Sequence, residues 1–185
     1  MKIDREILKS LIRIELNSTD NLKQFKGIDE ILVRQAEKES SLNLYSERYE
    51  AHLDDKSVGL YQLLTSTMKW LGFESNNVFE CYFPEVQVEY ALKYLDYLYS
   101  KFSEIHNKNE RLKMTFASYN MGKGNVNKAL KKGRQLEEIF YDGKDTLQGK
   151  WARYDTMIDL AEKYKIVSSK NADINRRYIK YIIES

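Results

Sequence analysis

The chain has 185 residues, enough for one substantial hydrophobic core, and its 42% hydrophobic and 31% charged residues exclude a disordered chain. The single cysteine, Cys81, excludes an internal disulfide, and neither His52 nor His106 stands at a metal-like spacing from it, so we expect no metal and no cofactor. The formal net charge of +2 indicates no partner by itself, and no segment approaches the apolar length of a membrane span.

The first predicted helix lies within residues 1–17. Its apolar residues recur at helical spacing and are Ile7, Leu8, Leu11, Ile12 and Leu16. Charged residues such as Lys9 and Arg13 break up this segment, whereas an export signal would need an uninterrupted hydrophobic run. We therefore expect a protein made in the cytoplasm without a recognisable signal, unless a leader has been removed, and no insertion into a membrane.

A second helix is predicted to begin at Asp29, which can cap it, and to carry Glu39 near its end. The polar, irregular stretch from Asn43 to Ser57 predicts a loop with room for a short hairpin. Between Gly59 and Gly72 the apolar residues again follow a helical period and predict a helix that Gly72 ends. Its apolar residues are Leu60, Leu63, Leu64, Met68 and Leu71.

Five more helices are predicted downstream. They lie around residues 88–102, 114–121, 126–130, 151–161 and 174–183, and the last is marked by Ile174, Tyr178, Ile179, Ile182 and Ile183. The sequence has no heptad run, no strand alternation and no glycine-rich phosphate-binding loop. The predicted fold class is mainly α, in one domain over residues 1–185.

The carboxyl-terminal third is basic. From residue 123 onward there are 14 Lys and Arg against 9 Asp and Glu, whereas residues 1–122 have 16 against 19. An ordinary solvated helix face accounts for this excess. A non-catalytic helical protein that binds wall polymer or nucleic acid through this third is the alternative from another functional class.

Four segments follow one another in a recognisable order. They are Glu-Ser-Ser-Leu-Asn at 39–43, Gly-Leu-Tyr-Gln-Leu at 59–63, the helical stretch 88–95, and Ser-Tyr-Asn-Met-Gly-Lys-Gly-Asn-Val at 118–126. Together they resemble the catalytic domain of the soluble lytic transglycosylases and goose-type lysozymes, glycoside hydrolase family 23. The resemblance covers a core of about residues 29–130 and leaves helices in 1–17 and 134–185 as additions. It implies a lysozyme-like fold with an irregular loop or short hairpin beside the catalytic helix.

Several residues depart from the family pattern and bear on the shape of the cleft and its subsite preference. They are Lys56 for a glycine, Tyr61 for methionine, Thr65 for proline, and Ser118 and Met121 for alanines.

The resemblance assigns the candidate site residues. Glu39 becomes the catalytic acid and base, because a carboxylic acid in a partly apolar site can deliver a proton to a glycosidic oxygen near neutral pH. Glu37 is its neighbour, but two positions along a helix it faces elsewhere. The expected substrate contacts are Ser40, Tyr61, Gln62, Tyr119 and Asn120. The expected structural residues of the motifs are Gly59, Gly122 and Gly124.

The resemblance implies cleavage of the β-1,4 bond between N-acetylmuramic acid and N-acetylglucosamine in peptidoglycan, by lytic transglycosylation to 1,6-anhydro ends. A lysozyme-type hydrolase of the same bond is the alternative, and it would need a second carboxylate, for which Asp54 and Asp55 are candidates. The expected partner is the glycan strand and not nucleic acid. We expect a monomer that acts on the wall after release, as a bacteriophage endolysin does, or a bacterial enzyme without its leader.

Overall fold

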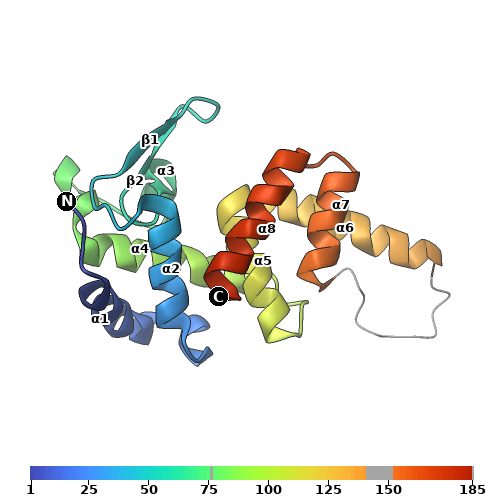
Figure 1. The fold of residues 1–185 in the computed structure, drawn as a ribbon, viewed down its shortest axis with the longest axis horizontal. Coiled ribbons are helices and arrows are strands. Elements are labelled where there is room, and N and C mark those ends of the chain that lie inside the picture. The colour runs from blue at the N-terminus through green and yellow to red at the C-terminus, as the bar shows by residue number, and fades with distance from the viewer. Residues whose placement is uncertain (76, 141–151, 185) are drawn as a thin grey trace. The chain divides into compact units, whose positions relative to one another are not determined.

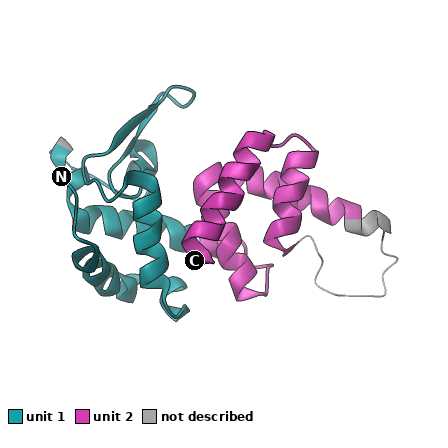
Figure 2. Ribbon diagram, viewed as in Figure 1, with its two compact units in different colours: residues 1–97 teal, residues 98–185 magenta. Residues whose placement is uncertain are grey.

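The structure is a computed structural model that describes residues 1–75, 77–140 and 152–184. The chain forms two compact units, unit 1 with residues 1–97 and unit 2 with residues 98–185 (Figure 2). The single domain expected from the sequence stays a prediction. The described elements are mostly helices with one small three-stranded sheet (Figure 1), which confirms the mainly α class and the short hairpin.

Unit 1 opens with a pair of helices, α1 (Arg5–Glu15) and α2 (Ile28–Ser40), joined by two short 3-10 turns at Leu16–Ser18 and Leu22–Gln24. The Asp4 carboxylate caps α1 by accepting hydrogen bonds from the backbone N–H groups of Glu6 and Ile7. The apolar faces of the two helices pack together. The residues buried between and beneath them are Leu8, Ile12, Leu32, Val33 and Ala36.

Charged side chains join α1 to α2 at their edge. Three basic residues spaced four apart on α1 reach acidic residues on α2, as Arg5 pairs with Glu30 and Glu37, Lys9 with Glu30, and Arg13 with Asp29. The prediction that Asp29 caps α2 is wrong. Gly27 holds the cap position in a left-handed conformation, and Asp29 lies in the first turn, where its carboxylate accepts from Arg13 at 2.7 Å.

A hairpin follows α2 (Figure 1), with strand β1 (Glu47–Glu50) antiparallel to β2 (Asp55–Val58). A two-residue strand, β3 (Leu63–Leu64), adds to β2 and leads directly into α3 (Thr65–Trp70). The helix predicted from Gly59 to Gly72 is therefore shorter than expected. Positive φ angles at Gly59 and Gln62 turn the chain before it can form a helix, and the strand pairing of Leu63–Leu64 uses the next backbone groups.

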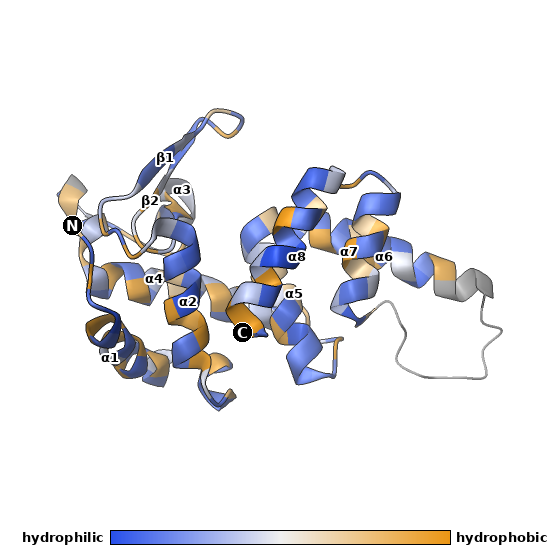
Figure 3. Cartoon of the chain, viewed as in Figure 1, coloured by the Kyte–Doolittle hydropathy of each residue, from blue (hydrophilic) through white to orange (hydrophobic). Residues whose placement is uncertain are grey.

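The remaining elements of unit 1 are a 3-10 turn at Val78–Tyr82 and the long helix α4 (Pro84–Ser100), whose last residues belong to unit 2. The apolar stripe predicted on this helix is buried and includes Val88, Ala91, Leu92, Leu95 and Leu98. Figure 3 shows this amphipathic pattern in the helices, with hydrophobic and hydrophilic residues alternating around their turns.

Unit 2 contains α5 (Lys108–Met121), α6 (Lys123–Phe140), α7 (Tyr154–Lys163) and α8 (Ser169–Ile183). Helix α5 packs against α6 and α8, and α6 against α7. The helix predicted at 126–130 is too short, because Gly122 alone makes the turn and α6 starts at the next residue. Trp151, predicted to belong to the helix at 151–161, lies outside the described residues.

One detail of α8 differs from the predicted apolar face. Ile174 is 41% exposed, and the neighbouring Asn175 is fully buried instead. Across residues 1–75, 77–140 and 152–184, the helices are each too short or too polar to span a membrane.

Candidate active site

The predicted site residues divide between the two units. Glu39, Ser40, Gly59, Tyr61 and Gln62 belong to unit 1, whereas Tyr119, Asn120, Gly122 and Gly124 belong to unit 2. In unit 1 they lie at the end of α2 or in the turn between β2 and β3, and in unit 2 they lie at the junction of α5 and α6.

Glu39 lies in the last turn of α2 and is half-buried. The next residue, Ser40, donates its hydroxyl to the Ala36 carbonyl at 3.0 Å, one turn back in the same helix. Ser41 and Leu42 then both adopt positive φ angles, 54° and 63°, which side chains other than glycine rarely do. Such strain concentrates at functional sites, and here it directly follows Ser40, the last residue of α2 and the neighbour of Glu39.

The neighbouring acid, Glu37, has a different environment. Its carboxylate accepts a hydrogen bond from Arg5 Nε at 3.1 Å, so it belongs to the ion pairs that join α2 to α1. One turn before Glu39 on the same side of the helix is Gln35, which is fully buried. Within the described part of the chain neither amide atom of Gln35 has a hydrogen-bond partner, an arrangement that costs stability.

Gln62 holds the turn before β3 against the start of the hairpin. Its side-chain nitrogen donates to the carbonyls of Ser46 at 3.1 Å and Gly59 at 3.0 Å, and its side-chain oxygen accepts from the Ser57 hydroxyl at 3.1 Å. Both N–H groups of the amide are therefore occupied within unit 1. Gln62 can meet a sugar only through the second lone pair of its oxygen, as an acceptor.

The backbone conformation and the close neighbours of residue 59 require a glycine at this position. Its φ is 74°, and a Cβ atom at this position would overlap the amide of Gln87 on α4. The Gln87 oxygen accepts from the Leu60 N–H, and its nitrogen donates to the Leu44 carbonyl at 3.1 Å. Sequence reasoning missed Gln87, although a polar residue four positions before Ala91 on the buried stripe of α4 is a readable signal.

Tyr61 packs inside unit 1. Its side chain is only 2% exposed, and burial raises its pKa far above the ordinary value of a tyrosine. The predicted contact of Tyr61 with substrate finds no support in this burial, because the ring offers no open face to a sugar.

The two candidate second carboxylates are both engaged in the hairpin. Asp54 accepts a hydrogen bond from the Tyr49 hydroxyl at the hairpin end. Asp55 accepts from the hydroxyls of Thr65 and Ser66 and, at 3.1 Å, from the Ser66 N–H, so it caps the start of α3. Burial raises the pKa of Asp55, but the hydrogen bonds from Ser66 and Thr65 outweigh it and keep this pKa below its ordinary value.

Aromatic side chains gather near the start of the hairpin. Tyr45, which is 52% exposed, lies with its ring centroid 5.5 Å from that of Tyr82. The Tyr82 hydroxyl donates to the Glu47 carboxylate, and this hydrogen bond holds the pKa of Glu47 below its ordinary value. Tyr45 therefore presents an aromatic face of the kind that sugars pack against.

In unit 2 the motif residues lie at the junction of α5 and α6. Tyr119 and Asn120 are half-buried in the last turn of α5, and Gly122 ends that helix with φ 86°. Gly124 lies in the first turn of α6, where a Cβ atom would meet nothing within 4 Å. The structure thus explains the glycine at 122 and gives no steric reason for the one at 124.

The side-chain oxygen of Asn120 has a partner on another helix. It accepts a hydrogen bond at 2.9 Å from the side-chain nitrogen of Asn175 on α8. Asn175 was not among the residues selected from the sequence, because a single asparagine within an apolar stripe resembles a surface position.

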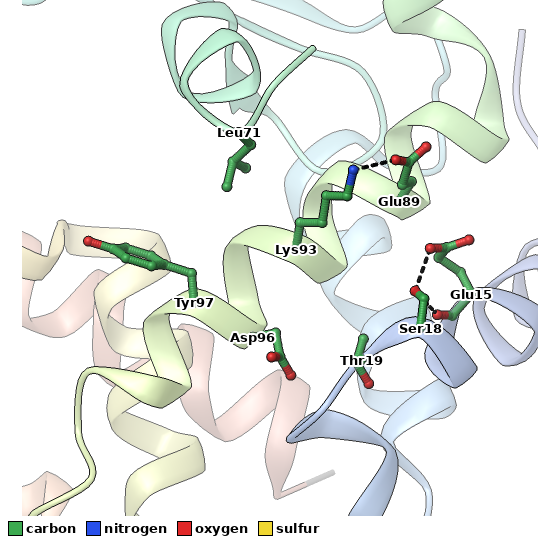
Figure 4. A pocket seen from close by; sticks show the side chains of 8 residues that line it. All are labelled: Glu15, Ser18, Thr19, Leu71, Glu89, Lys93, Asp96 and Tyr97. Atoms are coloured by element: carbon green, nitrogen blue, oxygen red, sulfur yellow. Dashed lines mark hydrogen bonds and ion pairs between the residues drawn. The ribbon is translucent and has the colours of Figure 1, made fainter.

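A pocket of about 520 Å³ on unit 1 contains none of these residues (Figure 4). Its charged groups are already paired, since Lys93 bonds Glu89 at 2.5 Å, and Asp96 accepts from the backbone of Asn21 and Leu22. The pocket thus offers few free charges to a ligand. In the part of the chain that the structure describes, no three His, Cys, Asp or Glu side chains are grouped to hold a metal ion.

Comparison with protein families gives one match. The model of the transglycosylase SLT domain matches residues 19–140, a range that includes every predicted site residue and passes through the boundary between the units. Searches of curated proteins and of solved structures found no significant match. Since the matched range covers more than half of the chain, the protein belongs to the transglycosylase SLT domain family, whose members are lytic transglycosylases of peptidoglycan with a mainly helical, lysozyme-like fold.

Proposed function

We propose that this protein cleaves the β-1,4 bond between N-acetylmuramic acid and N-acetylglucosamine with Glu39 as its one catalytic carboxyl group. The observation that carries the proposal is the end of α2, where two consecutive left-handed residues follow Glu39 and Ser40. The neighbouring Glu37 accepts a hydrogen bond from Arg5 in the contact between α2 and α1, whereas Glu39 is the acid that opens the Glu-Ser-Ser-Leu-Asn segment and is assigned here to proton transfer.

The reaction uses Glu39 twice. The protonated carboxyl gives its proton to the glycosidic oxygen, so the bond from that oxygen to C1 of the muramic sugar breaks and the N-acetylglucosamine fragment leaves. The positive charge that develops at C1 is stabilised by the sugar's own N-acetyl group. The Glu39 carboxylate then takes the proton of the C6 hydroxyl, and O6 bonds to C1 to give the 1,6-anhydro end without consuming water.

The hairpin supports transglycosylation over hydrolysis. A hydrolase would hold its attacking water on a second carboxylate. Asp55 instead accepts hydrogen bonds from Thr65 and Ser66, and Asp54 accepts one from Tyr49, so both carboxylates serve the hairpin and α3.

We propose that Ser40, Gln62, Tyr119 and Asn120 contact the glycan, and that Tyr45 offers it an aromatic face. Gln62 does so as a hydrogen-bond acceptor, because both of its N–H groups bond carbonyls of unit 1. The biological role proposed is lysis of bacteria by an endolysin, a monomer made in the cytoplasm that reaches the wall after release.

The test is mass spectrometry of the soluble fragments released from purified peptidoglycan by the wild type, Glu39→Gln and Glu37→Gln. Glu37→Gln is the matched control, because it removes a carboxylate two residues away, one that accepts a hydrogen bond from Arg5 in the contact between α2 and α1. We expect 1,6-anhydromuramic ends from the wild type and the control, and a loss of at least about 100-fold with Glu39→Gln.

Other outcomes have definite meanings. Reducing muramic ends would establish a hydrolase and would turn attention to Asp54 and Asp55. Equal release by Glu39→Gln and wild type would refute the role of Glu39. No release by any of the three proteins would favour a binding protein.

A further inference from the structure

A buried chain of polar side chains crosses unit 2. The Tyr154 hydroxyl at the start of α7 donates to the Asn175 oxygen at 3.0 Å, and the Asn175 nitrogen donates to the Asn120 oxygen at 2.9 Å. Asn175 is fully buried and Tyr154 is 4% exposed. Leaving a buried polar group unpaired costs free energy. The two hydrogen bonds therefore hold the three side chains in one arrangement.

The orientation of the Asn175 amide follows from a fourth group. Its nitrogen also lies 3.5 Å from the carbonyl oxygen of Ala117 on α5, and a carbonyl can only accept. The group of Asn175 that faces α5 must therefore be its NH₂. Asn120 accepts this hydrogen bond with its side-chain oxygen, so the NH₂ group of Asn120 points away from Asn175.

That NH₂ group is available to a ligand. Asn120 is partly exposed, and among the described residues its side-chain nitrogen donates to no other group. A free NH₂ with both hydrogens unused binds oxygen acceptors, such as the hydroxyl, ring and acetamido oxygens of a glycan.

We propose that Asn175 is a positioning residue that, supported by Tyr154, turns the Asn120 amide so that Asn120 meets the glycan as a hydrogen-bond donor. The inference rests on the proposed function of the motif residues. It gives α7 and α8 a role in the site although both lie beyond residues 19–140 of the family match.

Glu110 fixes the first member of the chain. Its carboxylate, in the first turn of α5, accepts from the Tyr154 backbone N–H at 2.7 Å. The start of α7 is thereby attached to the same helix that carries Asn120, so Tyr154 is placed relative to α5 by its backbone as well as by its hydroxyl.

The test compares two isosteric changes by the rate of fragment release from purified glycan strands. Asn120→Asp keeps an oxygen for Asn175 but removes the donor, and Asn175→Asp removes the donor that orients Asn120. We expect each change to lower kcat/KM about tenfold, because each removes the same oriented hydrogen bond to substrate. Tyr154→Phe, which leaves the Ala117 contact in place, should lower it about threefold.

A double-mutant cycle separates positioning from plain stability. In an Asn120→Ala background, Asn175→Asp should change kcat/KM less than about twofold, because the group it acts through is gone. Asn175→Leu, which has similar volume and no charge, repeats the cycle should the aspartate prevent folding. Thr115→Val, a change to a buried α5 hydroxyl that donates to the Arg111 carbonyl at 2.9 Å, is the control and should alter stability without altering kcat/KM.

Equal effects of the Asn175 changes with and without Asn120 would overturn the proposal, and so would full activity of Asn120→Asp. The Glu39→Gln variant keeps the two ideas apart. Activity that depends on Glu39 while the Asn175 effects are independent of Asn120 would reject the positioning role and leave the proposed function standing.

Discussion

Unit 1 and unit 2 hold their motif residues by different means. Four of the five described residues other than glycine with positive φ lie in unit 1, at Ser41, Leu42, Asp54 and Gln62, and they shape the end of α2 and the hairpin. Unit 2 has only Lys165 among them, after α7. Its motif residues end an ordinary helix, and a side chain from α8 holds one of them.

The difference shows what each unit depends on. In unit 1 the parts that fix the site are close in sequence, from residue 36 to residue 66, with Gln87 the main contribution from farther along the chain. In unit 2 Asn120 relies on Asn175, 55 residues downstream. Substitutions should therefore destabilise unit 1 mainly by disturbing its strained turns. They should destabilise unit 2 mainly by disturbing the packing of helices that are separate in sequence.

The largest effect expected is that of Gly59→Ala. A Cβ atom at φ 74° both strains the backbone and overlaps Gln87, so we expect a loss of ~3 kcal/mol in the free energy of unfolding. Gly72→Ala is the matched control, since it has φ 93° but nothing within 4 Å of the added atom, and it should cost ~1 kcal/mol. Urea titration measures both, and equal losses would mean that Gln87 does not constrain the turn.

A smaller effect, with a characteristic pH dependence, is expected for Asp55→Ala. Loss of the cap on α3 should cost about 1 to 2 kcal/mol at pH 7. Because the pKa of Asp55 is lower in the folded protein than its ordinary value of 3.8, the stabilisation is present above pH 3.8 and is lost as the pH falls through the lowered value. Denaturation at pH 7 and pH 3 should show the gap between the variant and the wild type closing. A gap of constant size would rule out the charged cap.

In unit 2, Glu110→Ala should cost about 1 kcal/mol by freeing the Tyr154 N–H at the start of α7. Hydrogen exchange should then rise in α7 and α8 and stay unchanged in α1 and α2. Glu110→Gln retains an acceptor oxygen and should restore most of the protection. Equal increases in hydrogen exchange in both units would contradict the prediction that each unit holds its motif residues through its own contacts.

The smallest effect is expected for Arg13→Gln in unit 1. Its ion pair with Asp29 has an arginine side chain that is 62% exposed, so solvent screens it and its removal should cost no more than ~0.5 kcal/mol. The cost should shrink further in 1 M salt. A larger loss that does not depend on salt would show that the ion pairs between α1 and α2 contribute more to the stability of unit 1 than we expect.

The sequence predicted the helices best where an apolar period continued without interruption. The buried stripe of α4 and the end of α5 before Gly122 were predicted correctly, and so was the helix α1, although Ile7 of its predicted apolar set is 58% exposed. The stretch from Gly59 to Gly72 was predicted as one helix, because the spacing of its leucines cannot show that Gln62 adopts a positive φ or that Leu63–Leu64 pairs with β2. The roles of the individual site residues stay predictions.

By itself the sequence determined the mainly helical class and, through four short segments in order, the family. Those features depend on local composition and spacing, which a single chain displays directly. Only the tertiary structure decided which side chains hold the motif residues. Gln87 reaches Gly59 and Leu60, and Asn175 reaches Asn120, through contacts between helices that are distant in sequence. A buried amide looks like any other polar residue until the fold shows which donor and acceptor it faces.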